Sequence, residues 1–258
     1  MINNEIIKEK IEDAELILVG IGEEFNGRNF LMQNERYLQI EEELKENNQY
    51  IWILPYVQKV FLRKYSALVN AIKKLSETLK NKNYFIVTTC MNGILEIADF
   101  KANRVVTPCG GPMKLQCTSP DCNVFKEVPE ILYSDIELYC DGKKGLDDIN
   151  LIMCPECNSP MEFNSLYSDK YKEAGYAEMW KAYTKWLQGT LNRKLCVLEL
   201  GVSLEYPSVI RFPFEKIAFF NQKSVFIRVH EKLYHLSDDI GQKGISHKEN
   251  AISFLNSI

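Results

Sequence analysis

The chain has 258 residues, of which 46% are hydrophobic and 26% are charged, and its formal net charge is −4. This balance is typical of an ordinary folded protein and excludes a collagen-like, disordered or low-complexity chain. It also disfavours nucleic-acid binding, because no basic excess is present to neutralise phosphates. No apolar run approaches the roughly 20 residues that span a bilayer, and residues 1–13 lack the pattern of a signal peptide. We therefore expect a cytoplasmic protein with reduced thiols and no membrane partner.

Short apolar runs alternate with amphipathic segments along most of the chain. The apolar runs predict strands buried on both faces, at residues 15–19, 84–88, 195–200 and 224–229. Charged or amphipathic segments between them predict helices at residues 34–48, 59–81 and 171–189. Core packing, rather than a ligand platform, is the expected role of the apolar stripe in the last helix, formed by Tyr176, Met179, Trp180, Tyr183 and Trp186. The alternation predicts an α/β fold with an open parallel sheet.

Residues 109–165 interrupt this alternation. They are rich in Cys, Gly, Pro, Asp and Asn, and they contain few long apolar runs. We interpret them as a small β-rich domain inserted into a large domain that is formed by residues 1–108 and 166–258.

Two close cysteine pairs lie within the inserted segment. Cys117 and Cys122 are separated by four residues, Cys154 and Cys157 by two, and 31 residues join the pairs. Two pairs of this kind can surround one tetrahedral ion, so the spacing predicts a structural Zn²⁺ site that stabilises a small domain. Four unconnected thiols and an iron–sulfur cluster are the alternatives, and Cys140, inside the gap, is a substitute ligand without a close partner.

A Gly-x-Gly turn follows the first predicted strand. Gly20 and Gly22 stand where a dinucleotide-binding fold brings a pyrophosphate against backbone N–H groups, although the same pattern often marks only a tight turn. Further along, one strand runs into Thr-Thr-Cys-Met-Asn-Gly at 88–93, and a later strand runs into Gly-Val-Ser-Leu at 201–204. With the four-cysteine segment between them, this order resembles the sirtuin family across nearly the whole chain. The resemblance implies a large Rossmann-like domain, with helices on both faces of its sheet, a small zinc-ribbon domain, and NAD in the cleft between them.

The first family motif, Gly-Ala-Gly followed by Ile or Ala and then Ser, keeps its glycines here but continues into Glu23 and Glu24. The Pro-Asp-Phe-Arg segment that follows in sirtuins is absent from the sequence. Two carboxylates beside a pyrophosphate would repel it unless they turn outward. The other interpretation places them at an outward-facing helix N-terminus, where acids are favourable.

The motifs around the reacting end of NAD differ more. In the Thr-Gln-Asn-Ile/Val-Asp-Gly motif, Thr88 matches, Asn92 stands at the family's Asp, and Cys90 stands at its Asn. In the Glu-Leu-His-Gly motif, Cys109 stands at the family's general base. A thiol with an ordinary pKa near 8.5 is a poor base unless a cation lowers that pKa, so a small residue in a relic pocket is the alternative interpretation.

The C-terminal motifs match better. Gly201 and Ser203 stand in a Gly-Thr-Ser-Leu-like stretch that contacts the adenosine side of NAD in the family, and His230 stands at an Asn that contacts the adenine ribose. For His230 a half-exposed loop histidine is an equal alternative. The segment 207–215 also resembles a bacterial, macrodomain-linked branch whose members act as protein ADP-ribosyltransferases.

Two hypotheses for function follow. In one, the chain binds NAD or ADP-ribose, or a protein partner, with weakened or lost deacetylase chemistry. In the other, it is an active NAD-dependent protein ADP-ribosyltransferase or deacylase with a protein substrate. Transfer needs the missing base less than deacylation does, because deacylation requires a ribose hydroxyl to be deprotonated. The missing Pro-Asp-Phe-Arg segment and the departures at Cys90, Asn92 and Cys109 favour the binding module slightly.

Overall fold

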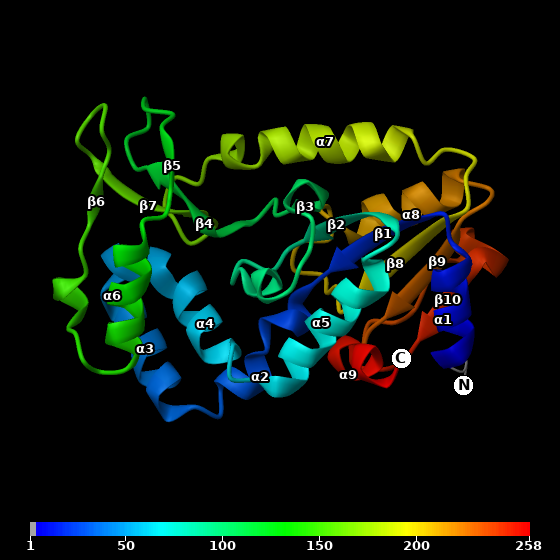
Figure 1. Ribbon diagram of the computed structural model, residues 1–258, viewed down its shortest axis with the longest axis horizontal. Helices are drawn as coiled ribbons and strands as arrows, with labels where there is room; N and C mark the ends of the chain where they lie inside the picture. Colours follow the sequence, from blue (N-terminus) through cyan, green and yellow to red (C-terminus); the bar gives the residue numbers. More distant parts are fainter. Residues whose placement is uncertain (1–3) are drawn as a thin grey trace.

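A parallel β-sheet forms the centre of the larger part of the molecule. The computed structural model describes residues 4–258 (Figure 1). Its six-stranded sheet has the order β10-β9-β8-β1-β2-β3, and each neighbouring pair of strands in it is parallel. The strands are β1 (Leu16–Ile21), β2 (Asn83–Thr88), β3 (Val105–Val106), β8 (Leu195–Leu200), β9 (Val225–Val229) and β10 (Gly244–His247).

Helices cover both faces of this sheet, because alternate strand residues are apolar on both sides. On one face, Ile17, Val19 and Ile21 share a core with the helices α1 (Asn4–Asp13), α5 (Ser66–Leu79) and α9 (Ala251–Ser257). On the other face, Leu16 and Leu18 share a second core with α7 (Ala177–Gln188) and α8 (Arg211–Phe220). In Figure 1, α7 and α8 lie above the sheet, and α1, α5 and α9 lie below it. The predicted α/β class with helices on both faces is confirmed.

A second, antiparallel sheet forms the other end of the molecule (Figure 1). Its order is β5-β4-β7-β6, with bounds β4 (Gly110–Cys117), β5 (Phe125–Glu127), β6 (Ile152–Met153) and β7 (Pro160–Ser165). The helices near it are α2 (Arg28–Leu31), α3 (Glu35–Glu46), α4 (Leu54–Leu62) and α6 (Glu130–Cys140). Short 3₁₀ turns complete the chain: η1 (Glu23–Asn26), η2 (Asn48–Ile53), η3 (Ile94–Ile97), η4 (Ala102–Arg104), η5 (Leu146–Asp148), η6 (Glu173–Gly175) and η7 (Asp238–Lys243).

Aromatic contacts join this second sheet to helices that come earlier in the chain. Tyr56 of α4 stacks on Tyr133 of α6, with ring centroids 4.4 Å apart, and Trp52 meets Phe163 of β7 edge-on at 5.2 Å. The four-cysteine segment therefore packs against residues from the first quarter of the chain. Helix α6 was missed by the sequence analysis, which expected a β-rich segment, because its apolar residues lie among Pro, Asp and Gly.

The predicted helix at 59–81 is wrong as a single helix. The chain leaves helical geometry at Tyr65, whose φ and ψ are −85° and 88°, so that α4 ends at Leu62 and α5 begins at Ser66. The Tyr65 ring stacks on Phe30, with centroids 4.6 Å apart and planes 4° apart. Because neither Gly nor Pro marks the break, the apolar spacing continues across it and conceals it.

The other predicted elements are confirmed. The helix predicted at 34–48 is α3, and Asn34 caps it by accepting a hydrogen bond from Tyr37 N. The aromatic side chains of α7 pack on the sheet, with Tyr183 buried and Trp180 partly buried against the second core. Cys196 of β8 is fully buried, as expected for a core residue. Within residues 4–258, no helix has both the length and the apolar character that a membrane crossing requires.

A buried ion pair joins β8 to β9 beneath α8. Glu199 is fully buried, and its oxygens accept from Arg228 Nε at 2.6 Å and from Arg228 Nη2 at 3.0 Å. Burial raises the pKa of Glu199, and the Arg228 guanidinium opposes that shift. Arg211 of α8 lies 3.5 Å from the same carboxylate and donates to Val202 O, so the pair also orders the loop after β8.

We predict that Arg228→Met lowers the free energy of unfolding by about 3–5 kcal/mol, because it leaves a buried carboxylate without its main partner. The double variant Glu199→Met with Arg228→Met should recover most of that loss, since it removes both charges. Urea unfolding of the three proteins measures this. A loss below about 1 kcal/mol for Arg228→Met would contradict the role of Arg228 as the partner of a buried charge, because exposed ion pairs contribute an amount of that size.

Candidate functional site

The connections between the parallel strands reverse direction between β1 and β8. The chain continues from β1 to β2 and β3 on one side, and β8, β9 and β10 lie on the other side. In doubly wound sheets, ligands bind at this reversal, outside the carboxyl ends of the strands. The residues predicted to bind a cofactor lie at this edge, in or directly after four strands: Gly20, Gly22, Thr88, Gly201, Ser203 and His230.

The two glycines after β1 allow the chain to pack against itself. A Cβ at Gly20 would lie 2.5 Å from Ile210 Cγ2 and 2.8 Å from the Phe214 ring, so this glycine lets α8 approach the strand. A Cβ at Gly22 would overlap the backbone of Val202. Gly22 N donates to Leu200 O at 2.9 Å, and Glu24 N donates to Gly201 O at 3.1 Å. The Gly-x-Gly turn is therefore closed against the loop that follows β8.

Glu23 bridges the ends of β2 and β8. Thr89 Oγ1 donates to one carboxylate oxygen at 2.7 Å, and Ser203 N donates to the other at 2.7 Å. The residue begins the 3₁₀ turn η1, as the helix-terminus interpretation expected. Its side chain, however, turns inward, so the expectation of outward-facing acids is wrong for Glu23. The two donors, Thr89 Oγ1 and Ser203 N, hold the Glu23 side chain in this direction.

Glu24 also turns inward and bridges two later segments. Its oxygens accept from Glu231 N at 2.9 Å and from Ala251 N, the first residue of α9, at 2.6 Å. Only 10% of its side chain is exposed, and burial raises its pKa. Gly201 has a φ of +61°, and a Cβ there would lie 2.6 Å from Glu24 Cβ. The glycine therefore gives Glu24 its space as well as the positive φ of the loop.

His230 lies beside Glu24 but is neutral. Its Nδ1 accepts from Lys232 N at 3.0 Å and from Leu233 N at 3.1 Å, which requires that Nδ1 carry no proton. Burial lowers the pKa of His230, and the nearby Arg211 cation lowers it further. The 3.2 Å distance between His230 Nδ1 and Glu24 Oε1 is thus a contact of two acceptors rather than a charged ion pair. The His230 ring therefore stabilises the loop after β9 through these two hydrogen bonds.

The side chains of Thr88, Cys90 and Asn92, at the end of β2 and after it, bond to backbone groups of the β1 end and of their own loop. Thr88 Oγ1 donates to Ile21 O at 3.0 Å and accepts from Cys90 N at 3.0 Å. Asn92 is fully buried, and its Oδ1 accepts from Ile94 N at 3.0 Å. The Cys90 thiol donates to Gly22 O at 3.1 Å, and burial raises its pKa. The side chains of Thr88, Cys90 and Asn92 therefore stabilise the conformation of the loop that follows β2.

Cys109 lies at the same edge, at the start of the second sheet. It is buried, and burial raises the pKa of its thiol to about 12, with the carboxylates of Glu23 and Glu205 adding to the increase. A thiol with this pKa stays protonated at neutral pH, and a protonated thiol is a poor base. Glu205 was missed by the sequence analysis because it is an exposed acid with no motif around it.

Thr89, Glu231 and Ala251 were missed as well. Thr89 follows the matched Thr88, and its side chain points to Glu23. Glu231 and Ala251 contribute backbone N–H groups, which no side-chain type announces. The sequence therefore contains no signal that would identify Glu231 or Ala251 as part of the site.

Two smaller cavities are lined by residues that follow β1 and β2. One, of about 300 Å³, is largely apolar and is lined by Thr88, Cys90 and Ile94 and by the segment up to Thr107. The other, of about 330 Å³, is lined by Glu23, Glu24, Arg28 and Tyr65 and by the beginning of α9. The predicted site residues thus lie between an apolar pocket on the β2 side and a polar pocket on the α9 side.

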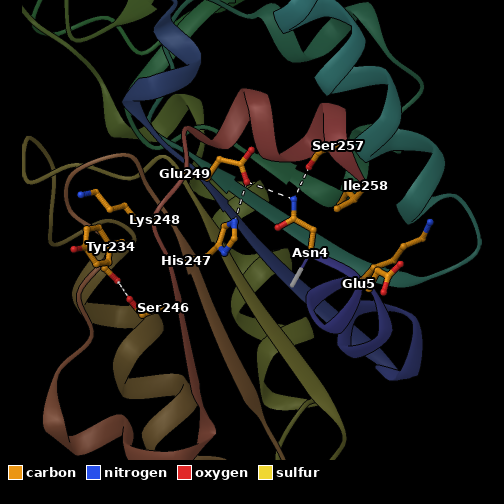
Figure 2. A pocket seen from close by; sticks show the side chains of 10 residues that line it. Asn4, Glu5, Tyr234, Ser246, His247, Lys248, Glu249, Ser257 and Ile258 are labelled. Atoms are coloured by element: carbon orange, nitrogen blue, oxygen red, sulfur yellow. Dashed lines mark hydrogen bonds and ion pairs between the residues drawn. The ribbon is translucent and has the colours of Figure 1, made fainter. Parts of the chain in front are cut away.

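A larger cavity of about 990 Å³ lies at the β10 side of the sheet, between α1, the end of β10 and the end of α9. Figure 2 shows that the side chains of Asn4, His247, Glu249 and Ser257 turn toward one another. His247 Nε2 lies 2.9 Å from Glu249 Oε2, and Asn4 Nδ2 donates to Ser257 Oγ at 2.7 Å. The residues predicted to bind a cofactor do not line it, so size alone does not identify the functional site.

The four predicted metal ligands meet in the second sheet. The sulfur atoms of Cys117, Cys122, Cys154 and Cys157 all lie within 4.8 Å of one another. The distance is 3.3 Å between Cys117 and Cys157, and 3.6 Å between Cys122 and Cys154. Tetrahedral zinc with bonds of about 2.3 Å holds sulfurs roughly 3.8 Å apart, so the donor set fits such an ion. Cys140 packs in the core instead, and the group formed by the four cysteines can bind a metal ion.

Solved structures with this arrangement are sirtuins. A crystal structure of a Sir2 homologue in complex with NAD matches 100% of this chain and 92% of its own, with a TM-score of 0.58 and 10% identity. A Sir2Tm structure with a propionylated peptide matches 100% and 97%, with a TM-score of 0.54 and 14% identity. A mutant Sir2 homologue in complex with ADP-ribose matches 98% and 94%, with a TM-score of 0.56 and 11% identity. The chain has the sirtuin fold.

Two curated proteins with similar sequences have ADP-ribosyltransferase in their names. A protein ADP-ribosyltransferase of Staphylococcus aureus is 22% identical over 188 residues, which are 70% of this chain and 57% of that protein. A probable bifunctional ADP-ribose hydrolase/ADP-ribosyltransferase of Fusarium oxysporum is 30% identical over 141 residues, which are 52% of this chain and 23% of that protein. The chain thus spans about half of the first relative and a quarter of the second. No family model matches the chain.

Proposed function

We propose that the chain is a sirtuin-fold protein that binds ADP-ribose or NAD at the carboxyl edge of its parallel sheet and does not deacylate proteins. The observation that carries the proposal is the convergence of Thr89 Oγ1, Ser203 N, Glu231 N and Ala251 N at the strand reversal. Such donors, at the carboxyl ends of parallel strands, suit the diphosphate and ribose oxygens of a dinucleotide.

The environment of Cys109 argues against deacylation. By the motif resemblance the thiol stands at the family's general base, and its pKa of about 12 keeps it protonated at neutral pH. Deacylation needs a base to take the proton of a ribose hydroxyl. ADP-ribosyl transfer depends less on such a base, because the acceptor can bring its own nucleophile.

Protein ADP-ribosyl transfer is the second candidate. It is favoured by the names of both curated relatives. In this function the apolar cavity beside Cys90 takes the nicotinamide end of NAD, and a protein acceptor attacks the ribose carbon as nicotinamide leaves. If Cys109 takes part as base or nucleophile, Cys109→Ala abolishes nicotinamide release, whereas retained release excludes that role.

A calorimetric titration of the metal-loaded protein with ADP-ribose and with NAD tests the proposal, with free nicotinamide measured in the same samples. We expect both ligands to bind and nicotinamide to stay below the amount of protein. Nicotinamide release through many turnovers would support the transferase instead. Absence of heat for both ligands at millimolar concentration would contradict nucleotide binding altogether.

We propose zinc as the metal of the four-cysteine cluster, because four thiolates leave no open position and suit a structural site. Three of the four sulfurs belong to buried residues, and Ser119 N donates to Cys117 Sγ at 3.4 Å. The ion would hold the loop of the first pair against the hairpin of the second and stabilise this sheet.

Metal analysis of the purified protein should find about one zinc per chain, and Cys154→Ser should lose the zinc and lower the melting temperature. Cys140→Ser is the matched control, since this buried cysteine lies in the same segment but outside the cluster, and it should keep the zinc. Iron with a visible absorption band, or a folded protein without metal, would contradict the zinc assignment.

A further inference from the structure

Two consecutive carboxylates accept hydrogen bonds from four different segments. Thr89 after β2 and Ser203 after β8 donate to the two oxygens of Glu23, each at 2.7 Å. The backbone N–H groups of Glu231 after β9 and Ala251 in α9 donate to the two oxygens of Glu24, at 2.9 and 2.6 Å. Each of the four carboxylate oxygens therefore has its own donor.

The carboxylates of Glu23 and Glu24 resemble a diphosphate in charge and in hydrogen bonding. Both consist of two adjacent anionic groups whose oxygens accept hydrogen bonds from backbone N–H groups. The Ser203 donor stands on the loop after β8, directly beside β1 at the strand reversal. That is the place where doubly wound folds hold the diphosphate of a dinucleotide. A ligand diphosphate and the carboxylates of Glu23 and Glu24 thus compete for the same donors.

The two anions cannot share the site. Like charges a few ångströms apart repel strongly where water is partly excluded, and only 10% of the Glu24 side chain is exposed. A bound diphosphate must therefore displace the carboxylates rather than lie beside them.

The residues around Glu24 leave space for its inward-facing side chain, and an adjoining cavity offers both carboxylates a second position. Gly201, which lacks a Cβ, leaves the space that Glu24 fills. The polar cavity of about 330 Å³ is lined by Glu23 and Glu24 themselves, together with Arg28. The Arg28 side chain is 60% exposed and pairs with Glu41 at 2.9 Å, so it places a cation at the border of this cavity.

We propose that Glu23 and Glu24 decide whether the cleft takes a diphosphate: they occupy its donors in the free protein, and they turn into the adjoining cavity when an ADP-ribose-type ligand binds. This inference rests on the proposed nucleotide site. The carboxylates of Glu23 and Glu24 then set the affinity of that site for its ligand.

The test compares the wild type with the double variant Glu23→Gln, Glu24→Gln, using ADP-ribose and adenosine as probes in calorimetry. Glutamine keeps the size of the side chain and removes the charge, so it holds the loops more weakly and repels a diphosphate less. We expect ADP-ribose to bind the double variant at least tenfold more tightly than the wild type. Adenosine, which lacks the diphosphate, should bind both proteins equally.

Glu15→Gln is the matched control, because Glu15 pairs with Arg193 just before β1, at the opposite edge of the sheet, and the substitution also removes one negative charge. It should leave both affinities unchanged. If circular dichroism finds the double variant unfolded, the single variant Glu23→Gln is measured in the same way, with an expected gain in the same direction.

Three results would overturn the inference. Equal ADP-ribose affinity in the wild type and the variants would reject it while leaving the proposed function intact. Weaker ADP-ribose binding by folded variants would mean that the carboxylates hold the ligand instead of competing with it. Absence of ADP-ribose binding by every protein would reject the proposed function, and the inference with it.

Discussion

The loops at the carboxyl edge of the parallel sheet are joined by two carboxylates. Glu23 connects the ends of β2 and β8, and Glu24 connects the end of β9 to the start of α9. Charge-assisted hydrogen bonds of this kind are worth about 1.5–3 kcal/mol each, so together they fix the shape of the crevice. Gly201 leaves the space for the Glu24 side chain, and His230 lies beside it.

Much of the framework follows from the sequence by simple physical rules. Apolar runs buried on both faces identified β1, β2, β8 and β9, and the cysteine spacing identified four sulfur atoms that the fold brings within 4.8 Å. The broken helix at Tyr65 and helix α6 were not predicted, because tertiary contacts decide both. Apolar spacing continues through Tyr65, and the stack of Tyr56 on Tyr133 is a contact between distant segments.

The candidate site was predicted only in part. The motif positions of Gly20, Gly22, Gly201 and Ser203 meet at one edge of the sheet, because parallel strands end there together. The inward direction of Glu23 and Glu24 was not predictable, since their partners include backbone N–H groups of Ser203, Glu231 and Ala251. A motif comparison assigns residues to positions, whereas hydrogen-bond donors from distant loops decide what each side chain does there.

A crystal structure of the protein grown with ADP-ribose tests the central claim most directly. The account predicts diphosphate oxygens within hydrogen-bond distance of Ser203 N and Ala251 N, with the Glu23 and Glu24 carboxylates turned into the cavity beside Arg28. ADP-ribose bound while both carboxylates still hold those donors, or bound in another part of the molecule, would contradict it.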